Sequence, residues 1–149
     1  MRSLGIIVVL IVCSYPLQAG EKSAAKDLKA LQGVWDVTAV SYNGKDYYKK
    51  TQNKFRFNIK GNEITVEGNK AVSKEYGRIK FKLDPSVMPN CVDLMVSAGN
   101  QLDLKMEAIY LLKGDVCKLC VRIFGTDRPG EFSAPDGSNN AYLVLKKRK

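Results

Sequence analysis

A strict alternation of apolar and polar residues between Lys54 and Glu67 constrains the fold more than any other feature of the chain. This period of two is typical of β-strands with one buried face. A hairpin turn at Gly61-Asn62 satisfies both faces in one register. The register pairs Lys60 with Glu63, Ile59 with Ile64, Phe57 with Val66, and Arg56 with Glu67. A slip of one residue would move every apolar side chain to the solvent face, so the register is strongly specified.

A second hairpin is predicted at Gly114-Asp115. It pairs Leu112 with Cys117, Tyr110 with Leu119, and Ala108 with Val121, which gives one wholly apolar face. The opposite face, with Ile109 and Leu111 near Cys120, is more apolar than a solvated surface should be. We therefore expect another segment to cover it, and the N-terminal helix is the candidate.

The rest of the chain predicts one short helix and further strands. The helix runs from Glu21 to Leu31 and ends at Gly33. The other predicted strands are Val34 to Tyr42, Tyr76 to Leu83, Cys91 to Ser97 and Ala141 to Lys146, with a short additional run around Tyr47. No second helix is expected. Phe124 to Asn140 is predicted to be a long loop over or beside one mouth of the folded domain. The fold class predicted is mainly β: an antiparallel up-and-down barrel of about eight strands.

The N-terminus has the pattern of a secretory signal peptide. Met1-Arg2-Ser3 is a basic start, Leu4 to Val12 is an apolar run too short to cross a bilayer, and cleavage is expected after Ala19. Lipidation at Cys13 is disfavoured because the branched Val12 precedes it. We expect a single domain over residues 20–149 in an exported protein that is periplasmic, associated with the cell envelope or extracellular.

The 149 residues include no histidine. This excludes Ser-His and Cys-His catalytic arrangements and zinc sites with an imidazole ligand. Asp127, Arg128 and Glu131 in the long loop could serve as acid, anion clamp and base. Asp127-Arg128-Pro129 is, however, more typical of a local ion pair that fixes a turn. We therefore expect a non-catalytic protein with no cofactor and no metal site.

Three cysteines remain after the predicted cleavage: Cys91, Cys117 and Cys120. The last two form a CxxC motif, which elsewhere indicates a redox pair or half of a zinc site. Here the motif lies in a predicted strand, where residues three apart point to opposite faces. Cys117 is expected in the core and Cys120 on the other face.

The chain is basic, with 24 Lys and Arg against 15 Asp and Glu and a formal net charge of +9. Such an excess favours anionic polymers, lipid head groups or nucleic acid. Lysines that alternate with apolar residues could instead simply solvate the outer face of the sheet. The concentrated exception is the tail Lys146 to Lys149. Nucleic-acid binding is disfavoured by the predicted export and by the lack of exposed aromatic residues among the basic strand positions.

A series of motifs along the chain resembles a known family. In order they are Leu31-Gln32-Gly33-Val34-Trp35, Asn43-Gly44-Lys45, Phe81-Lys82-Leu83-Asp84-Pro85, Val92-Asp93-Leu94, Ile109-Tyr110, Gly114-Asp115, Asp127-Arg128-Pro129-Gly130-Glu131-Phe132 and Leu143-Val144-Leu145-Lys146. Together they resemble the lipocalin-like domain found in many exported proteins of planctomycete bacteria, over about Asp27 to Lys147. The resemblance implies a barrel and an exported location but no reaction. It also implies that Trp35 closes one end of the barrel beneath a basic side chain of the final strand, with Lys146 and Arg148 as candidates.

Two functions from different classes remain open. The first is binding of a small apolar ligand inside the barrel, in a cavity lined by Phe55, Phe57, Phe81 and Tyr110. These rings could instead interdigitate and leave no space. The alternative is a cell-envelope interaction module that binds a protein or an anionic polymer through its basic surface.

Overall fold

The computed structural model describes residues 17–50 and 54–149. Helix α1 spans Leu17–Leu31, so the predicted helix is confirmed and begins earlier than expected. Residues 1–16 of the predicted signal segment lie outside the described residues. Within the described part of the chain, no helix combines the length and the apolar character needed to cross a bilayer.

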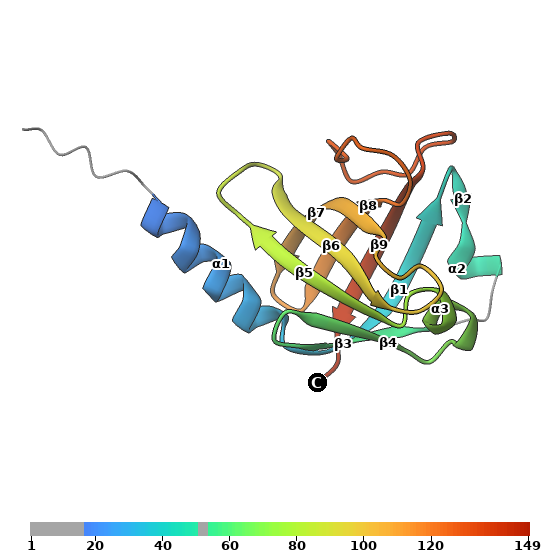
Figure 1. The fold of residues 1–149 in the computed structure, drawn as a ribbon, viewed down its shortest axis with the longest axis horizontal. Helices are drawn as coiled ribbons and strands as arrows, with labels where there is room; N and C mark the ends of the chain where they lie inside the picture. Colours follow the sequence, from blue (N-terminus) through green and yellow to red (C-terminus); the bar gives the residue numbers. More distant parts are fainter. Residues whose placement is uncertain (1–16, 51–53) are drawn as a thin grey trace, which may run out of the picture.

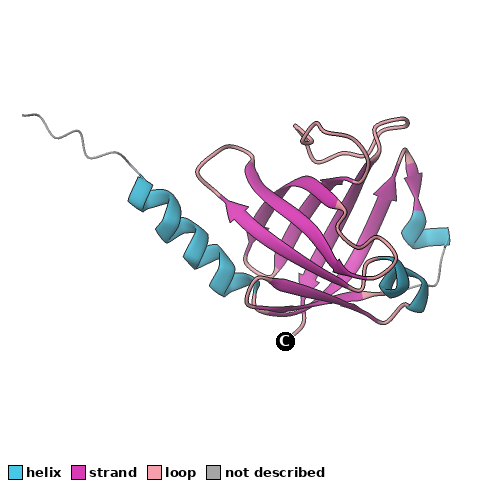
Figure 2. Cartoon of the chain, in the orientation of Figure 1, coloured by secondary structure: helices cyan, strands magenta, loops and turns pink. Residues whose placement is uncertain are grey.

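The strands form one antiparallel sheet that closes on itself (Figures 1 and 2). They are β1 (Gly33–Tyr42), β2 (Lys45–Asp46), β3 (Arg56–Lys60), β4 (Glu63–Glu67), β5 (Arg78–Asp84), β6 (Asn90–Ala98), β7 (Lys105–Lys113), β8 (Val116–Arg122) and β9 (Asn140–Lys147). Pairing of β1 with β9 closes an eight-stranded barrel of β1 and β3 to β9, and β2 extends β1 beyond it. The predicted fold class is confirmed.

Both predicted hairpins have the predicted registers. Around Gly61-Asn62, all four expected pairs from Lys60 with Glu63 to Arg56 with Glu67 are present. Around Gly114-Asp115, all three expected pairs are present as well. Phe57, Phe81 and Tyr110 belong to one buried interior. The two hairpins therefore present their apolar faces to a shared core, as the alternation predicts.

Two short helices correct the expectation that only one helix exists. The short extra strand predicted around Tyr47 is present as β2, which ends at Asp46, but Tyr47 itself begins helix α2, which spans Tyr47–Lys50. Helix α3 spans Lys70–Glu75 between β4 and β5. The Asn69 side chain caps α3 by accepting from the backbone N–H groups of Ala71 and Val72. Such a cap satisfies donors that a helix start leaves unpaired.

The two ends of the barrel differ in what covers them. Helix α1 leads into β1 at one end, which we call the closed end, and it extends away from the barrel (Figure 1). Helices α2 and α3 lie at the other end, which we call the open end. Because the strands alternate in direction, β1, β4, β6 and β8 finish at the open end and β3, β5, β7 and β9 begin there.

The long loop between β8 and β9 contains no helix or strand, as predicted. It covers the apolar outer patch of β7 and β8. Ile109 and Cys120, which are paired in register, are 1% and 0% exposed, and the Cys120 thiol donates to the Ser133 carbonyl oxygen at 3.3 Å. The cover is therefore this loop, and the expectation that α1 provides it is wrong. Leu111 remains 43% exposed.

Candidate functional site

The barrel contains a cavity of about 480 Å³ in its open half. Its lining is mainly apolar and comes from nearly every strand, from α2 and α3, and from the start of the long loop. The lining residues are Val40, Tyr42, Tyr47, Tyr48, Phe55, Phe57, Ile64, Val66, Asn69, Ala71, Val72, Tyr76, Ile79, Leu94, Met106, Leu119, Val121, Ile123, Phe124, Ala141 and Leu143. Cavities of this size and polarity are typical of small-molecule sites.

Of the four residues expected to line a cavity, two do so and two do not. Phe55 and Phe57 line it, with ring centroids 5.9 Å apart. Phe81 and Tyr110 are buried but do not line it. Tyr110 lies nearer the closed end, where its hydroxyl donates to the Asp27 carboxylate of α1 at 2.7 Å. Burial, and next this hydrogen bond, raise the pKa of Tyr110.

Sequence reasoning missed most of the cavity. Tyr42 is the last residue of β1, Tyr76 lies just before β5, and Ile123 and Phe124 lie just beyond β8. The alternation in β1 carries a signal for one of them, because Val40 and Tyr42 continue on one face of the strand. For Tyr76, a residue between α3 and β5, the alternation gives no comparable signal.

Polar groups in the cavity are few and uncharged. Among the described side chains, the lining contains four tyrosines and Asn69 but no Lys, Arg, Asp or Glu. Burial raises the pKa of the Tyr76 hydroxyl, with smaller contributions from the Glu75 carboxylate and from Tyr42. Tyr76 therefore stays protonated at neutral pH and presents a hydrogen-bond donor to the cavity.

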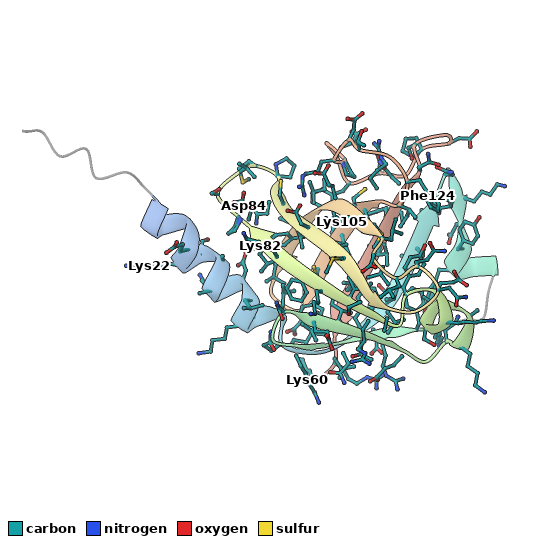
Figure 3. The ribbon with its side chains drawn as sticks, in the orientation of Figure 1. Lys22, Lys60, Lys82, Asp84, Lys105 and Phe124 are labelled. Atoms are coloured by element: carbon teal, nitrogen blue, oxygen red, sulfur yellow. The ribbon has the colours of Figure 1, made fainter. Side chains whose placement is uncertain are left out.

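The rim of the cavity exposes apolar surface to solvent. Tyr47 of α2 is 41% exposed, and Phe124 at the start of the long loop is 51% exposed (Figure 3). The Tyr47 ring also contacts the Tyr42 ring, with centroids 6.2 Å apart. Aromatic side chains thus continue from the interior to the mouth.

The closed end is sealed around Trp35, which is fully buried. Its indole N–H donates to the Leu31 carbonyl oxygen at 2.8 Å, at the last residue of α1. The Lys147 ammonium lies 5.7 Å from the ring centroid and donates to the Ala30 carbonyl oxygen at 2.9 Å. The expected basic cover over Trp35 is therefore present, but Lys147 supplies it, and the expected Lys146 and Arg148 do not.

Further contacts hold the junction between α1 and β1. Gly33 begins β1 with a φ of 115°, which favours glycine. The Gln32 side chain accepts from the Gly61 N–H at 2.7 Å and donates to the Gly61 carbonyl oxygen at 2.9 Å. Arg148 forms two hydrogen bonds with the Asp36 carboxylate, at 2.7 and 3.1 Å. These contacts tie the end of α1, the β3–β4 turn and the chain after β9 together.

Arg128 anchors the long loop across the barrel wall. Its guanidinium donates to the carbonyl oxygens of Val92 and Ala108, at 3.1 and 2.7 Å. It also pairs with the carboxylates of Asp93 and Glu107. Among the described residues, these are its only ion pairs. The expected local pair with Asp127 is therefore wrong, and the carboxylates of Asp127 and Glu131 lie in exposed residues.

Pro129, next to Arg128, is buried. This loop segment is therefore held by contacts with distant strands and not by contacts within its own turn.

The cysteines lie where the strand pattern predicts. Cys117 is in the core, Cys120 is buried on the opposite side beneath the long loop, and both are free thiols. Burial, and next the Asp27 carboxylate, raise the pKa of the Cys117 thiol to about 12. Across residues 17–50 and 54–149, no group of three or more His, Cys, Asp or Glu side chains could hold a metal ion.

A second hollow, of about 680 Å³, lies along β5, β6 and β7. Its lining includes Lys80, Lys82 and Lys105, of which the last two are labelled in Figure 3. It also includes the carboxylates of Asp93 and Glu107, which Arg128 already engages. The hollow is therefore mixed in charge rather than uniformly basic.

Comparisons of the chain with protein-family models, with curated proteins and with solved structures each find no match. Function is therefore inferred from the cavity and its surroundings.

Proposed function

We propose that this is an exported, non-catalytic binding protein that holds a small apolar ligand inside the open half of its barrel. The observation that carries the proposal is the cavity of about 480 Å³ with its predominantly apolar lining. Water in such a space finds few hydrogen-bond partners, so an apolar molecule gains free energy by replacing it.

The position of the cavity also supports binding. Exposed aromatic side chains at the rim, such as Tyr47 and Phe124, extend the apolar surface to the mouth. An entering ligand would thus remain in contact with apolar groups from the mouth to the interior. The mixed charge of the outer hollow around Lys80, Lys82 and Lys105 gives an anionic envelope partner less support.

A titration with the neutral lipophilic dye N-phenyl-1-naphthylamine tests the proposal. We expect saturable dye binding with an increase in dye emission. Val121→Phe adds bulk to a lining residue of β8 and is expected to weaken dye binding at least tenfold, because overfilling leaves less room for the dye.

Val116→Phe is the matched control. It makes the same change on the same strand at a residue that is 38% exposed and does not line the cavity. Equal dye binding by the two variants, or no dye binding by the unmodified protein, would contradict the proposal.

A further inference from the structure

The interior tyrosines supply a clue to the chemistry of the ligand. Tyr42, at the end of β1, and Tyr76, between α3 and β5, both line the cavity. In the described part of the chain, neither hydroxyl has a hydrogen-bond partner from the protein. A ligand that enters the cavity displaces water from these hydroxyls, and an unpaired polar group in an apolar environment costs free energy. The two hydroxyls therefore favour a ligand with a polar group that replaces the lost hydrogen bonds.

The two tyrosines line the same part of the cavity. Both belong to the open end, where β1 finishes and β5 begins. The remainder of the lining, including Phe57, Leu94 and Leu119, is apolar and can contact a hydrocarbon body.

The charge around this pair disfavours an anionic ligand. Among the side chains that the structure describes, no cation lines the cavity, so a carboxylate inside it would lack a counter-ion from them. The Glu75 carboxylate, next to Tyr76, already accepts from Asn100 and Gln101 at 2.9 and 3.0 Å. These hydrogen bonds, Gln101 first, lower the pKa of Glu75, so it carries a negative charge at neutral pH.

A cationic ligand is disfavoured for a related reason. Glu75 does not line the cavity, so an ammonium group inside would be desolvated without a paired charge.

We propose that the preferred ligand is an uncharged lipophile with one hydrogen-bonding end group, such as a hydroxyl, which binds to the hydroxyls of Tyr42 and Tyr76. The proposal rests on the cavity binding proposed above. The hydrocarbon part fills the apolar interior, and the end group gives the two hydroxyls the partner that the protein does not supply.

Displacement of N-phenyl-1-naphthylamine from the full chain by four ten-carbon compounds tests this inference. Decan-1-ol, decane, decanoate and decylammonium differ only at the end group. We expect decan-1-ol to displace the dye at the lowest concentration. Tyr42→Phe and Tyr76→Phe should each weaken decan-1-ol binding about fivefold, the effect of one hydrogen bond, and leave decane binding unchanged.

Tyr142→Phe is the matched control. Its ring lies outside the cavity lining against Phe132, with centroids 6.5 Å apart, so binding of all four compounds should stay unchanged. Tighter binding of decanoate or decylammonium than of decan-1-ol would overturn the inference. So would unchanged decan-1-ol binding in the Tyr42→Phe and Tyr76→Phe variants.

In either of those cases, dye and decane binding would leave the proposed function standing. A protein that binds neither the dye nor any of the four compounds would overturn both proposals.

Discussion

The closed and open ends of the barrel use similar residue types for opposite purposes. At the closed end, the polar atoms of Trp35 and Tyr110 are paired with the Leu31 carbonyl and the Asp27 carboxylate of α1. At the open end, the Tyr42 and Tyr76 hydroxyls have no hydrogen-bond partner among the described residues. The difference separates two regions along the barrel axis: α1 pairs the polar atoms at one end, and no described residue pairs the two hydroxyls at the other.

The largest effect should come from Trp35→Ala at the closed end. Loss of a fully buried indole is expected to lower the free energy of unfolding by about 3–5 kcal/mol. The measurement is urea unfolding. Leu102→Ala, in the β6–β7 loop at the open end, removes a side chain that is 57% exposed and should change stability by about 0.5 kcal/mol or less. Equal costs for the two substitutions would break the comparison.

Arg128→Ala tests the long loop between β8 and β9, which begins and ends at the open end and is anchored to β6 and β7. It removes charge-assisted hydrogen bonds to the Val92 and Ala108 carbonyls, and we expect a loss of about 2 kcal/mol. The released loop should also expose Cys120, so an aromatic disulfide reagent should modify Cys120 faster while Cys117 stays protected. Arg128→Lys should restore only part of the protection, because lysine lacks the planar fork. Unchanged thiol reactivity would show that the loop is held by other contacts.

The pH dependence of stability gives a further test of the closed end, because Cys117 lies on the α1 side of the core. Its pKa rises on folding from an ordinary value of 9.0 to about 12, so the folded protein holds the proton more tightly than the unfolded chain does. The associated stabilisation is complete below pH 9 and is lost as the pH rises towards 12, by at most about 1.4 kcal/mol per pH unit. In Cys117→Ala this part of the alkaline loss should disappear.

Val121→Ala is the control for the pH experiment. It lowers stability without removing a titrating group, so it should retain the wild-type pH dependence between pH 9 and 12. Urea unfolding at fixed pH steps gives both slopes. Parallel curves for Cys117→Ala and the unmodified protein would contradict the expectation.

The smallest effect on stability should come from Phe124→Ala at the open rim. The side chain is 51% exposed, so we expect a change within about 0.5 kcal/mol. Dye release should nevertheless accelerate by about twofold to fivefold, because apolar contact area at the mouth is lost. Stopped-flow dilution measures the rate. A large stability loss without a change in release would reverse the roles assigned to the two ends.

The parts of the fold that were predictable from the sequence are those set by local pairing. The hairpin at Gly61-Asn62 needs only a turn and an alternating pattern, and both are encoded within a few residues. Helix α3 was missed although Asn69 provides a cap signal at its start. With only six residues, α3 offers too little helical periodicity to outweigh the strands around it.

The basic partner of Trp35 could have been predicted from the same alternation. Leu143 and Leu145 point inward, so the next inward position of β9 is Lys147, and the register indeed pairs Lys147 with Trp35. The position of the cavity along the barrel axis could not be predicted in this way. It depends on how far the strands are staggered around the barrel, which no single hairpin encodes. Phe57 and Tyr110 both face inward, but only Phe57 lies at cavity height.

The pairing of β1 with β9 has a consequence for how the chain reaches this structure. Trp35 and Lys147 are partners across the seam, so the sheet keeps two unprotected edges until β9 has been synthesised. Bringing β1 and β9 together closes a long segment, which costs chain entropy before the contacts between the two strands form. We therefore expect folding to be slow for a small domain. During that interval, the unpaired edges of β1 and β8 are open to pairing with other chains.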